Sequence, residues 1–161
     1  LNIDVHAILA VRNPLEVVAS LERRNKFPAI KSALLWSRYF IDAERDTRGW
    51  SRCFVDYDAL LKAPLATVRR ISNELGVTFP VSDTELDGLL AEALKVSLRH
   101  HIASTDQLAR AGNSASPPMV AYPWALAAAA GKNPPVEVLD RLAADLEEVE
   151  RGHGIVYAPS A

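Results

Sequence analysis

The chain has 161 residues, of which 49% are hydrophobic and 24% are charged, a composition typical of one globular domain with a buried core. Its net charge of −2 excludes a nucleic-acid surface built on bulk positive charge, and no apolar run approaches the ~18 residues of a membrane-spanning helix. The single cysteine, Cys53, excludes an internal disulfide and is typical of a reducing compartment, so we expect a cytoplasmic protein.

The first predicted element is a short strand over residues 5–11, where the sequence VHAILAV is almost continuously apolar. Such a run is typical of a parallel strand that is buried on both faces. Asn13 and Pro14 follow at once, and these residue types are preferred at the N-cap and at the first position of a helix. We therefore predict a helix over residues 14–25, directly after the strand.

Two more helices and a second strand are predicted in the middle of the chain. A helix is predicted over residues 29–47, where one face carries apolar residues at helical spacing: Ile30, Ala33, Trp36, Phe40 and Ala43. Residues 52–56 have the composition of a short strand, and residues 64–76 form an amphipathic pattern that ends at a glycine. The predicted order of elements up to this point is βααβα.

The rest of the chain is predicted to be helical with one long loop. Ser82 and Glu85 have the spacing of a capping box, so a helix is expected directly after Ser82. Residues 111–135 mix Pro, Gly, Ser and Ala, which predicts a loop with one short helix over residues 123–130. A final helix is predicted over residues 136–151.

Arg12 and Ser20 are the candidate ligands for an anion. Arg12 lies where the first strand meets the first helix, and the first turn of a helix presents N–H groups and the positive end of the peptide dipoles to an anion. Ser20 shares a helical arc with Glu16 and is expected to face the same pocket as Arg12. From spacing alone, the simpler interpretation is favoured, in which Arg12 pairs with Glu16 and Ser20 is a surface serine.

Two sequence blocks carry a resemblance to a known family. Residues 10–14 (AVRNP), with Ser20 eight residues after Arg12, resemble the 3′-phosphate-binding motif of sulfotransferases that use 3′-phosphoadenosine 5′-phosphosulfate. Residues 54–61 (FVDYDALL), followed by a proline and the sequence ISNELG, are similar to the family's Tyr-Glu-Asp-Leu, Pro and Leu-Gly sequence. Trp36 and the run LRHH at residues 98–101 also resemble features of the family's bacterial branch.

This resemblance implies a fold and an activity. The fold is expected to be α/β, an incomplete three-layer unit of the P-loop nucleoside-triphosphate-hydrolase-like class that is predominantly helical. Residues 1–105 would form the sulfotransferase-like part that binds the 3′-phosphate, and residues 106–161 a helical C-terminal part, within a single domain or domain fragment. The implied reaction transfers a sulfuryl group from 3′-phosphoadenosine 5′-phosphosulfate to a hydroxyl or amine acceptor.

The resemblance also implies roles for individual residues. Arg12 and Ser20 are expected to bind the 3′-phosphate, and Tyr57 to lie beside the adenine, although a half-buried aromatic that covers the strand end is its simpler interpretation. Arg99 is expected to add a second positive charge at the 3′-phosphate. The simpler interpretation of residues 99–101 is the end of a helix, where the helix dipole favours cationic side chains. The two histidines that follow Arg99 point to different sides of any regular element, so no metal site is predicted.

The chain departs from the family at the phosphate loop. None of its seven glycines lies in a loop of the type Gly-x-x-Arg/Lys-Ser/Thr-Gly-Ser/Thr, which holds the 5′-phosphosulfate in the family, and no catalytic residue is predicted. We therefore expect further sequence upstream of Leu1 and no activity from this chain alone. Two alternatives remain: a noncatalytic α/β module that binds a nucleotide or a protein, and a fragment of a nucleotide kinase.

Overall fold

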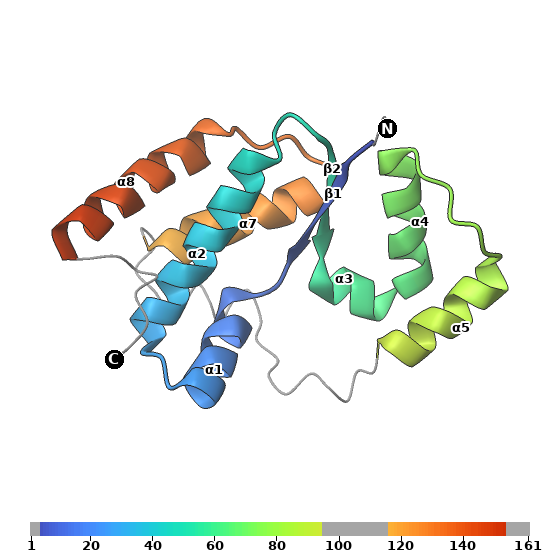
Figure 1. The fold of residues 1–161 in the computed structure, drawn as a ribbon, viewed down its shortest axis with the longest axis horizontal. Helices are drawn as coiled ribbons and strands as arrows, with labels where there is room; N and C mark the ends of the chain where they lie inside the picture. The colour runs from blue at the N-terminus through green and yellow to red at the C-terminus, as the bar shows by residue number, and fades with distance from the viewer. Residues whose placement is uncertain (1–3, 95–115, 154–161) are drawn as a thin grey trace.

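Two parallel strands lie at the centre of a mostly helical fold (Figure 1). The structure, a computed structural model, describes residues 4–94 and 116–153. Strands β1 (His6–Val11) and β2 (Ser51–Asp56) pair with Leu9 opposite Phe54. The helices in the described ranges are α1 (Pro14–Asn25), α2 (Ala29–Asp46), α3 (Tyr57–Lys62), α4 (Pro64–Leu75), α5 (Asp83–Ala93), α7 (Pro117–Ala129) and α8 (Glu137–His153). The predicted class, α/β and predominantly helical, is confirmed, and none of these helices has the length and apolarity to cross a bilayer.

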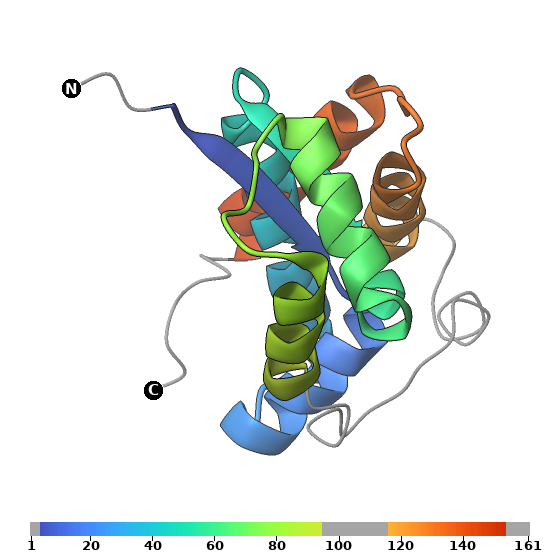
Figure 2. The same ribbon diagram turned by 90° about the vertical axis from the view of Figure 1, so that its right-hand side faces the viewer.

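Different helices cover the two faces of the sheet. One face contributes Leu9, Val11 and Phe54 to a core that it shares with α2, α7 and α8. On the other face, Cys53 and Val55 of β2 pack against α4. Figures 1 and 2 show α4 and α5 on the opposite side of the strands from α2, α7 and α8. The sheet is therefore enclosed on both sides at β2.

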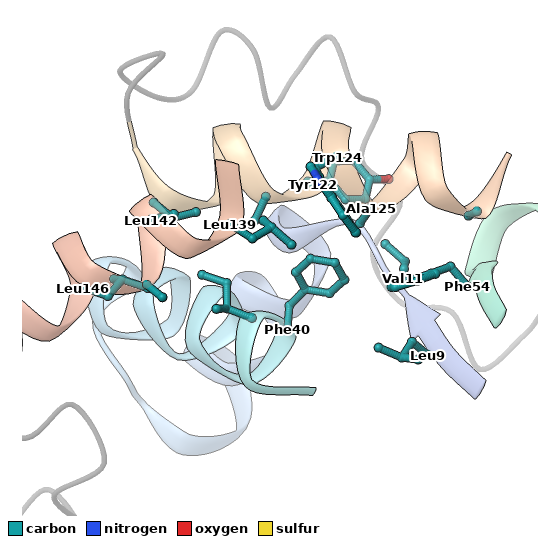
Figure 3. Packing of buried hydrophobic residues seen from close by; sticks show 14 residues of the cluster. Leu9, Val11, Phe40, Phe54, Tyr122, Trp124, Ala125, Leu139, Leu142 and Leu146 are labelled. Carbon is teal, nitrogen blue, oxygen red and sulfur yellow. The ribbon is translucent and has the colours of Figure 1, made fainter. Parts of the chain in front are cut away.

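Aromatic side chains join three elements at the centre of the larger core (Figure 3). The ring of Phe54 in β2 lies 5.7 Å from that of Trp124 in α7 and 6.4 Å from that of Phe40 in α2, centroid to centroid. Trp124 also donates from Nε1 to the carbonyl oxygen of Pro135 at 2.9 Å, so its polar atom is satisfied. Such tilted and edge-on pairs contribute about 0.5–1.5 kcal/mol each beyond the area that they bury.

The local signals for helix ends are confirmed. Asn13 caps α1 through its side-chain oxygen, and Pro14 occupies the first position of that helix. Gly76 ends α4 with a left-handed φ of 66°, which a residue without Cβ adopts at little cost. Ser82 and Glu85 form the predicted capping box at the start of α5.

Strand β1 is not buried on both faces, so that prediction is wrong. Leu9 and Val11 are buried, but Ile8 between them is 54% exposed and Val5, just before the strand, is 52% exposed. The reason is that α4 packs over β2 and leaves the same face of β1 uncovered. An apolar run indicates a strand, but it does not tell which face a helix covers.

The buried face of α2 also differs from the prediction. Ile30 is 77% exposed and Ala43 is exposed, whereas Ile41 and Glu44 are buried. The helix contacts α1, α7 and α8, and this wide buried face includes a carboxylate that helical periodicity assigns to solvent. The periodicity therefore predicted the helix and the burial of Phe40 correctly, but not the exposure of Ile30 and Ala43 at the two ends of the apolar face.

Two helices were mispredicted. Helix α7 begins at Pro117, six residues before the predicted helix over residues 123–130, because prolines fit the first helical positions, where N–H groups lack intrahelical partners. Pro123 lies inside this helix and is exposed. Helix α3 was not predicted at all; it begins after Asp56, whose Oδ1 accepts the N–H of Asp58 at 3.0 Å.

A fully buried carboxylate ties α2 to β2 and α8. Glu44 accepts hydrogen bonds from Arg48 Nη2 at 2.8 Å and from Arg52 Nη2 at 2.9 Å, and its side chain is 0% exposed. Arg48 also donates to Asp140 Oδ1 at 2.7 Å. Hydrogen bonds to Glu44 and Asp140 hold the pKa of Arg48 above its usual range. Because a buried charge without a partner is unfavourable, this cluster fixes how α2 sits against the sheet.

The Glu44→Ala variant is expected to lower the free energy of unfolding by about 3 kcal/mol, because it leaves two partly buried guanidinium groups without their shared partner. Urea unfolding followed by tryptophan fluorescence measures this change. Glu74→Ala is the matched control: Glu74 pairs with Arg70 at the surface, so its loss costs at most about 1 kcal/mol. Equal losses in the two variants would contradict the assigned role of Glu44.

Candidate functional site

The carboxyl ends of β1 and β2 lie at one edge of the parallel pair. The register places Val11 opposite Asp56, so Arg12 and Tyr57 each follow the end of a neighbouring strand. Ligands of open α/β sheets bind at this edge, outside the carboxyl ends of the strands. The candidate ligands predicted from two distant parts of the sequence are thereby carried by adjacent strands.

Arg12 and Tyr57 are in contact. The guanidinium carbon of Arg12 lies 4.9 Å from the centroid of the Tyr57 ring. Tyr57 is half-buried as the first residue of α3, and the Asp56 cap fixes the start of that helix. A cation over an aromatic face contributes roughly 0.5–2 kcal/mol, depending on its exposure to water. This contact therefore gives the guanidinium a defined position at the edge of the sheet.

Arg12 also forms the ion pair that spacing alone favoured. Its Nε lies 2.9 Å from Oε2 of Glu16, whose side chain is 0% exposed, whereas the Arg12 side chain is 34% exposed. Within residues 4–94 and 116–153, the terminal nitrogens Nη1 and Nη2 of Arg12 have no hydrogen-bond acceptor. One side of the guanidinium thus holds Glu16 through Nε.

The first turn of α1 does not present the expected N–H groups to an anion. The side-chain oxygen of Asn13 accepts the N–H of Leu15 at 3.0 Å, and its carbonyl oxygen accepts those of Glu16 and Val17 at 3.1 and 3.3 Å. Pro14, the remaining residue of the turn, has no N–H. The prediction of unpaired backbone donors at this turn is therefore wrong, and an anion here depends on side-chain donors and on the helix dipole.

Trp36 of α2 fixes the backbone of the same turn. Its Nε1 donates to the carbonyl oxygen of Arg12 at 3.1 Å, and its ring stacks on Phe40 with centroids 5.6 Å apart. Arg12 is thus held through its carbonyl oxygen by α2 and through its side chain by Glu16 and Tyr57. Helical periodicity and the family resemblance singled out Trp36, but neither predicted its hydrogen bond to Arg12.

The other predicted site residues are not joined to this cluster by an observed contact. Ser20 is half-buried on α1, one turn beyond Glu16, and its hydroxyl has no hydrogen-bond partner among the residues that the structure describes. Helix α1 begins at Pro14, so Ser20 lies two turns into the helix and Arg12 lies before it. The convergence of Arg12 and Ser20 on one anion stays a prediction. Arg99 and the two histidines after it lie outside the described residues.

The described ranges contain no group of three His, Cys, Asp or Glu side chains that could hold a metal ion. Cys53 is buried in β2 under α4, and burial raises the pKa of its thiol, so it stays protonated near neutral pH. Cys53 is therefore a small buried residue of the core between β2 and α4.

Comparisons with protein-family models, curated proteins and solved structures find no match to this chain. A function therefore has to be inferred from its own residues and their geometry.

The Glu16→Ala variant is expected to lower the free energy of unfolding by about 1.5–3 kcal/mol, because it removes a buried, charge-assisted hydrogen bond. Thermal or urea unfolding measures the loss. Glu22→Ala changes an exposed carboxylate on the same helix and is expected to cost less than about 0.5 kcal/mol. If Glu16→Ala were as stable as Glu22→Ala, the Arg12–Glu16 pair would not be what holds the turn.

Proposed function

We propose that the chain is the 3′-phosphate-binding part of a sulfotransferase that uses 3′-phosphoadenosine 5′-phosphosulfate, with a P-loop-like arrangement of its strands and helices. The supporting observation is the contact between Arg12 and Tyr57 at the carboxyl edge of the sheet. The family resemblance assigns these residues to the phosphate and the adenine of one nucleotide. Two residues that bind one small ligand have to lie close together, and these two do.

The 3′-phosphate would be bound by side chains. Arg12 Nη1 and Nη2 donate to two phosphate oxygens, and the Ser20 hydroxyl donates to a third. Glu16 already holds Nε of Arg12, which orients the planar guanidinium before the ligand arrives. The carboxylate repels a phosphate dianion, but the charge of Arg12 offsets it, and the positive end of the α1 dipole favours the anion further. Arg99 is expected to supply an additional positive charge.

The adenine would lie against Tyr57. Its ring stacks on the base or its hydroxyl hydrogen-bonds to it, and the guanidinium on the ring ties the base site to the phosphate site. In this arrangement Tyr57 contacts the base and Arg12 contacts the phosphate. Their contributions to the binding free energy can therefore be measured separately.

The proposed reaction transfers the sulfuryl group in line. The oxygen or nitrogen of the acceptor attacks sulfur, the bond between sulfur and the 5′-phosphate oxygen breaks, and 3′-phosphoadenosine 5′-phosphate leaves. The acceptor loses its proton to a base that we do not assign among the described residues. What this chain contributes is position: a nucleotide held at its 3′-phosphate and base keeps the sulfuryl group at a fixed place.

Calorimetry is expected to show that the chain binds 3′-phosphoadenosine 5′-phosphate at least tenfold more tightly than adenosine 5′-phosphate, because charge-assisted hydrogen bonds contribute about 1.5–3 kcal/mol each. Arg12→Lys keeps the charge but loses the planar pair of donors, so most of this preference disappears. Ser20→Ala is expected to weaken binding of the 3′-phosphorylated nucleotide about fivefold. Arg23→Ala, an exposed arginine of α1, is the matched control. Equal affinity of the unmodified chain for both nucleotides would contradict the proposal.

The Tyr57→Leu variant is expected to weaken the binding of both nucleotides by a similar factor, about tenfold, because base stacking does not depend on the 3′-phosphate. The same calorimetric titrations, repeated with this variant, measure the effect. A variant that loses affinity only for the 3′-phosphorylated nucleotide would place Tyr57 at the phosphate instead of the base.

A further inference from the structure

Arg12 lies in the short connection between β1 and α1, outside both elements. The last pair of the strand ladder is Val11 with Asp56, and the first carbonyl oxygen that accepts N–H groups of α1 is that of Asn13. The carbonyl oxygen of Arg12 is therefore used by neither element. Because a peptide group is planar, the direction of this carbonyl fixes the backbone torsion ψ of Arg12 and with it the direction in which the side chain leaves the main chain.

Trp36 of α2 donates the hydrogen bond that this carbonyl oxygen accepts. The distance from its Nε1 to the oxygen is 3.1 Å, and the two residues are 24 positions apart in the sequence. The indole stacks on Phe40 with centroids 5.6 Å apart, and it meets the ring of Tyr122 in α7 edge-on at 6.0 Å. Aromatic pairs in these geometries attract each other, so the indole N–H has a fixed position in the core. The core thereby determines the backbone conformation at Arg12.

We infer that Trp36 is a positioning residue for the 3′-phosphate and acts through the backbone of Arg12. The inference rests on the proposed function. A bidentate contact between a guanidinium and a phosphate depends on the orientation of the guanidinium plane as well as on its charge. A hydrogen bond that orients the start of the Arg12 side chain therefore contributes to the preference for a 3′-phosphorylated nucleotide.

Glu16 and Trp36 fix opposite ends of Arg12. Glu16 accepts a hydrogen bond from Nε at 2.9 Å and holds the guanidinium, whereas Trp36 holds the main chain. An arginine that is fixed at one end only can still move its terminal nitrogens, because several rotatable bonds separate Cα from the guanidinium. Loss of the Trp36 donor is thus expected to loosen the Arg12–Glu16 bond as well as the orientation of the guanidinium.

Trp124 of α7 offers a matched control within the same core. Its Nε1 also donates to a backbone carbonyl oxygen, that of Pro135 at 2.9 Å, and its ring also packs against Phe40, with centroids 6.2 Å apart. Pro135 lies in the connection between α7 and α8, whereas Arg12 lies between β1 and α1. A Trp→Phe substitution at either position removes one indole donor from the core, but only Trp36→Phe removes it from Arg12.

The first measurement needs no nucleotide. The Nε–H signal of Arg12 is identified in 1H–15N spectra by its absence in Arg12→Lys, and it exchanges slowly with water while it is bonded to the buried Glu16. Trp36→Phe is expected to accelerate this exchange about fivefold, because a freer main chain weakens the Arg12–Glu16 bond. Trp124→Phe is expected to leave the exchange rate unchanged.

The second measurement is calorimetry with 3′-phosphoadenosine 5′-phosphate and adenosine 5′-phosphate. Trp36→Phe is expected to reduce the preference for the 3′-phosphorylated nucleotide about fivefold, because adenosine 5′-phosphate lacks the group that Arg12 binds and keeps its affinity. Trp124→Phe is expected to keep the preference of the unmodified chain.

A third measurement uses the unmodified chain, so it tests the inference even where Trp36→Phe does not fold. The indole N–H resonance of Trp36 is expected to shift when 3′-phosphoadenosine 5′-phosphate is added, and to shift less with adenosine 5′-phosphate. The indole resonance of Trp124 is expected to keep its position with both nucleotides.

The inference is overturned if Trp36→Phe leaves the Nε–H exchange of Arg12 unchanged, if it keeps the full preference for the 3′-phosphorylated nucleotide, or if the Trp36 indole resonance responds equally to both nucleotides. In each case the proposed function stands as long as the unmodified chain shows the preference. Equal affinity of the unmodified chain for the two nucleotides would overturn the proposed function and this inference together.

Discussion

The parallel pairing of β1 with β2 is the constraint on which the rest of the structure depends. Parallel strands end at the same edge, so the register of Val11 against Asp56 brings the residues that follow them together. This places the Arg12 guanidinium on the Tyr57 ring, and Glu16 and the Trp36 indole then hold the arginine from two other directions. The candidate site follows from this two-stranded ladder.

Helix ends could be predicted from the sequence because a few neighbouring residues determine them. Most of the wrong predictions concern which faces are buried, and these faces depend on contacts between distant elements. Asn13, Gly76 and the capping box at Ser82 act within a few residues of a helix end, so the sequence alone reveals them. The burial of Glu44 depends on Arg52, which reaches it from another element, and helical periodicity does not register such a partner. The uncovered face of β1 is likewise decided by packing between elements. The early start of α7 has a local cause, because prolines fit the first helical positions.

The candidate site was predictable to different degrees. The ion pair of Arg12 with Glu16 joins residues four apart, and spacing alone favoured it. The contact of Arg12 with Tyr57 joins residues that α1, α2 and β2 separate along the chain, so only the family resemblance brought these residues together. The backbone donors expected at the first turn of α1 proved to be occupied, because Asn13 satisfies them with both of its oxygens. An anion at this turn would therefore depend on side-chain donors and on the helix dipole.

The central claim is that Arg12, Ser20 and Tyr57 surround one nucleotide. A crystal structure of the chain with 3′-phosphoadenosine 5′-phosphate tests it most directly. The account predicts that the 3′-phosphate lies within about 2.7–3.0 Å of an Arg12 terminal nitrogen and of the Ser20 hydroxyl, with the adenine against Tyr57. A nucleotide bound elsewhere, or Arg12 and Ser20 facing separate environments with no phosphate between them, would contradict it.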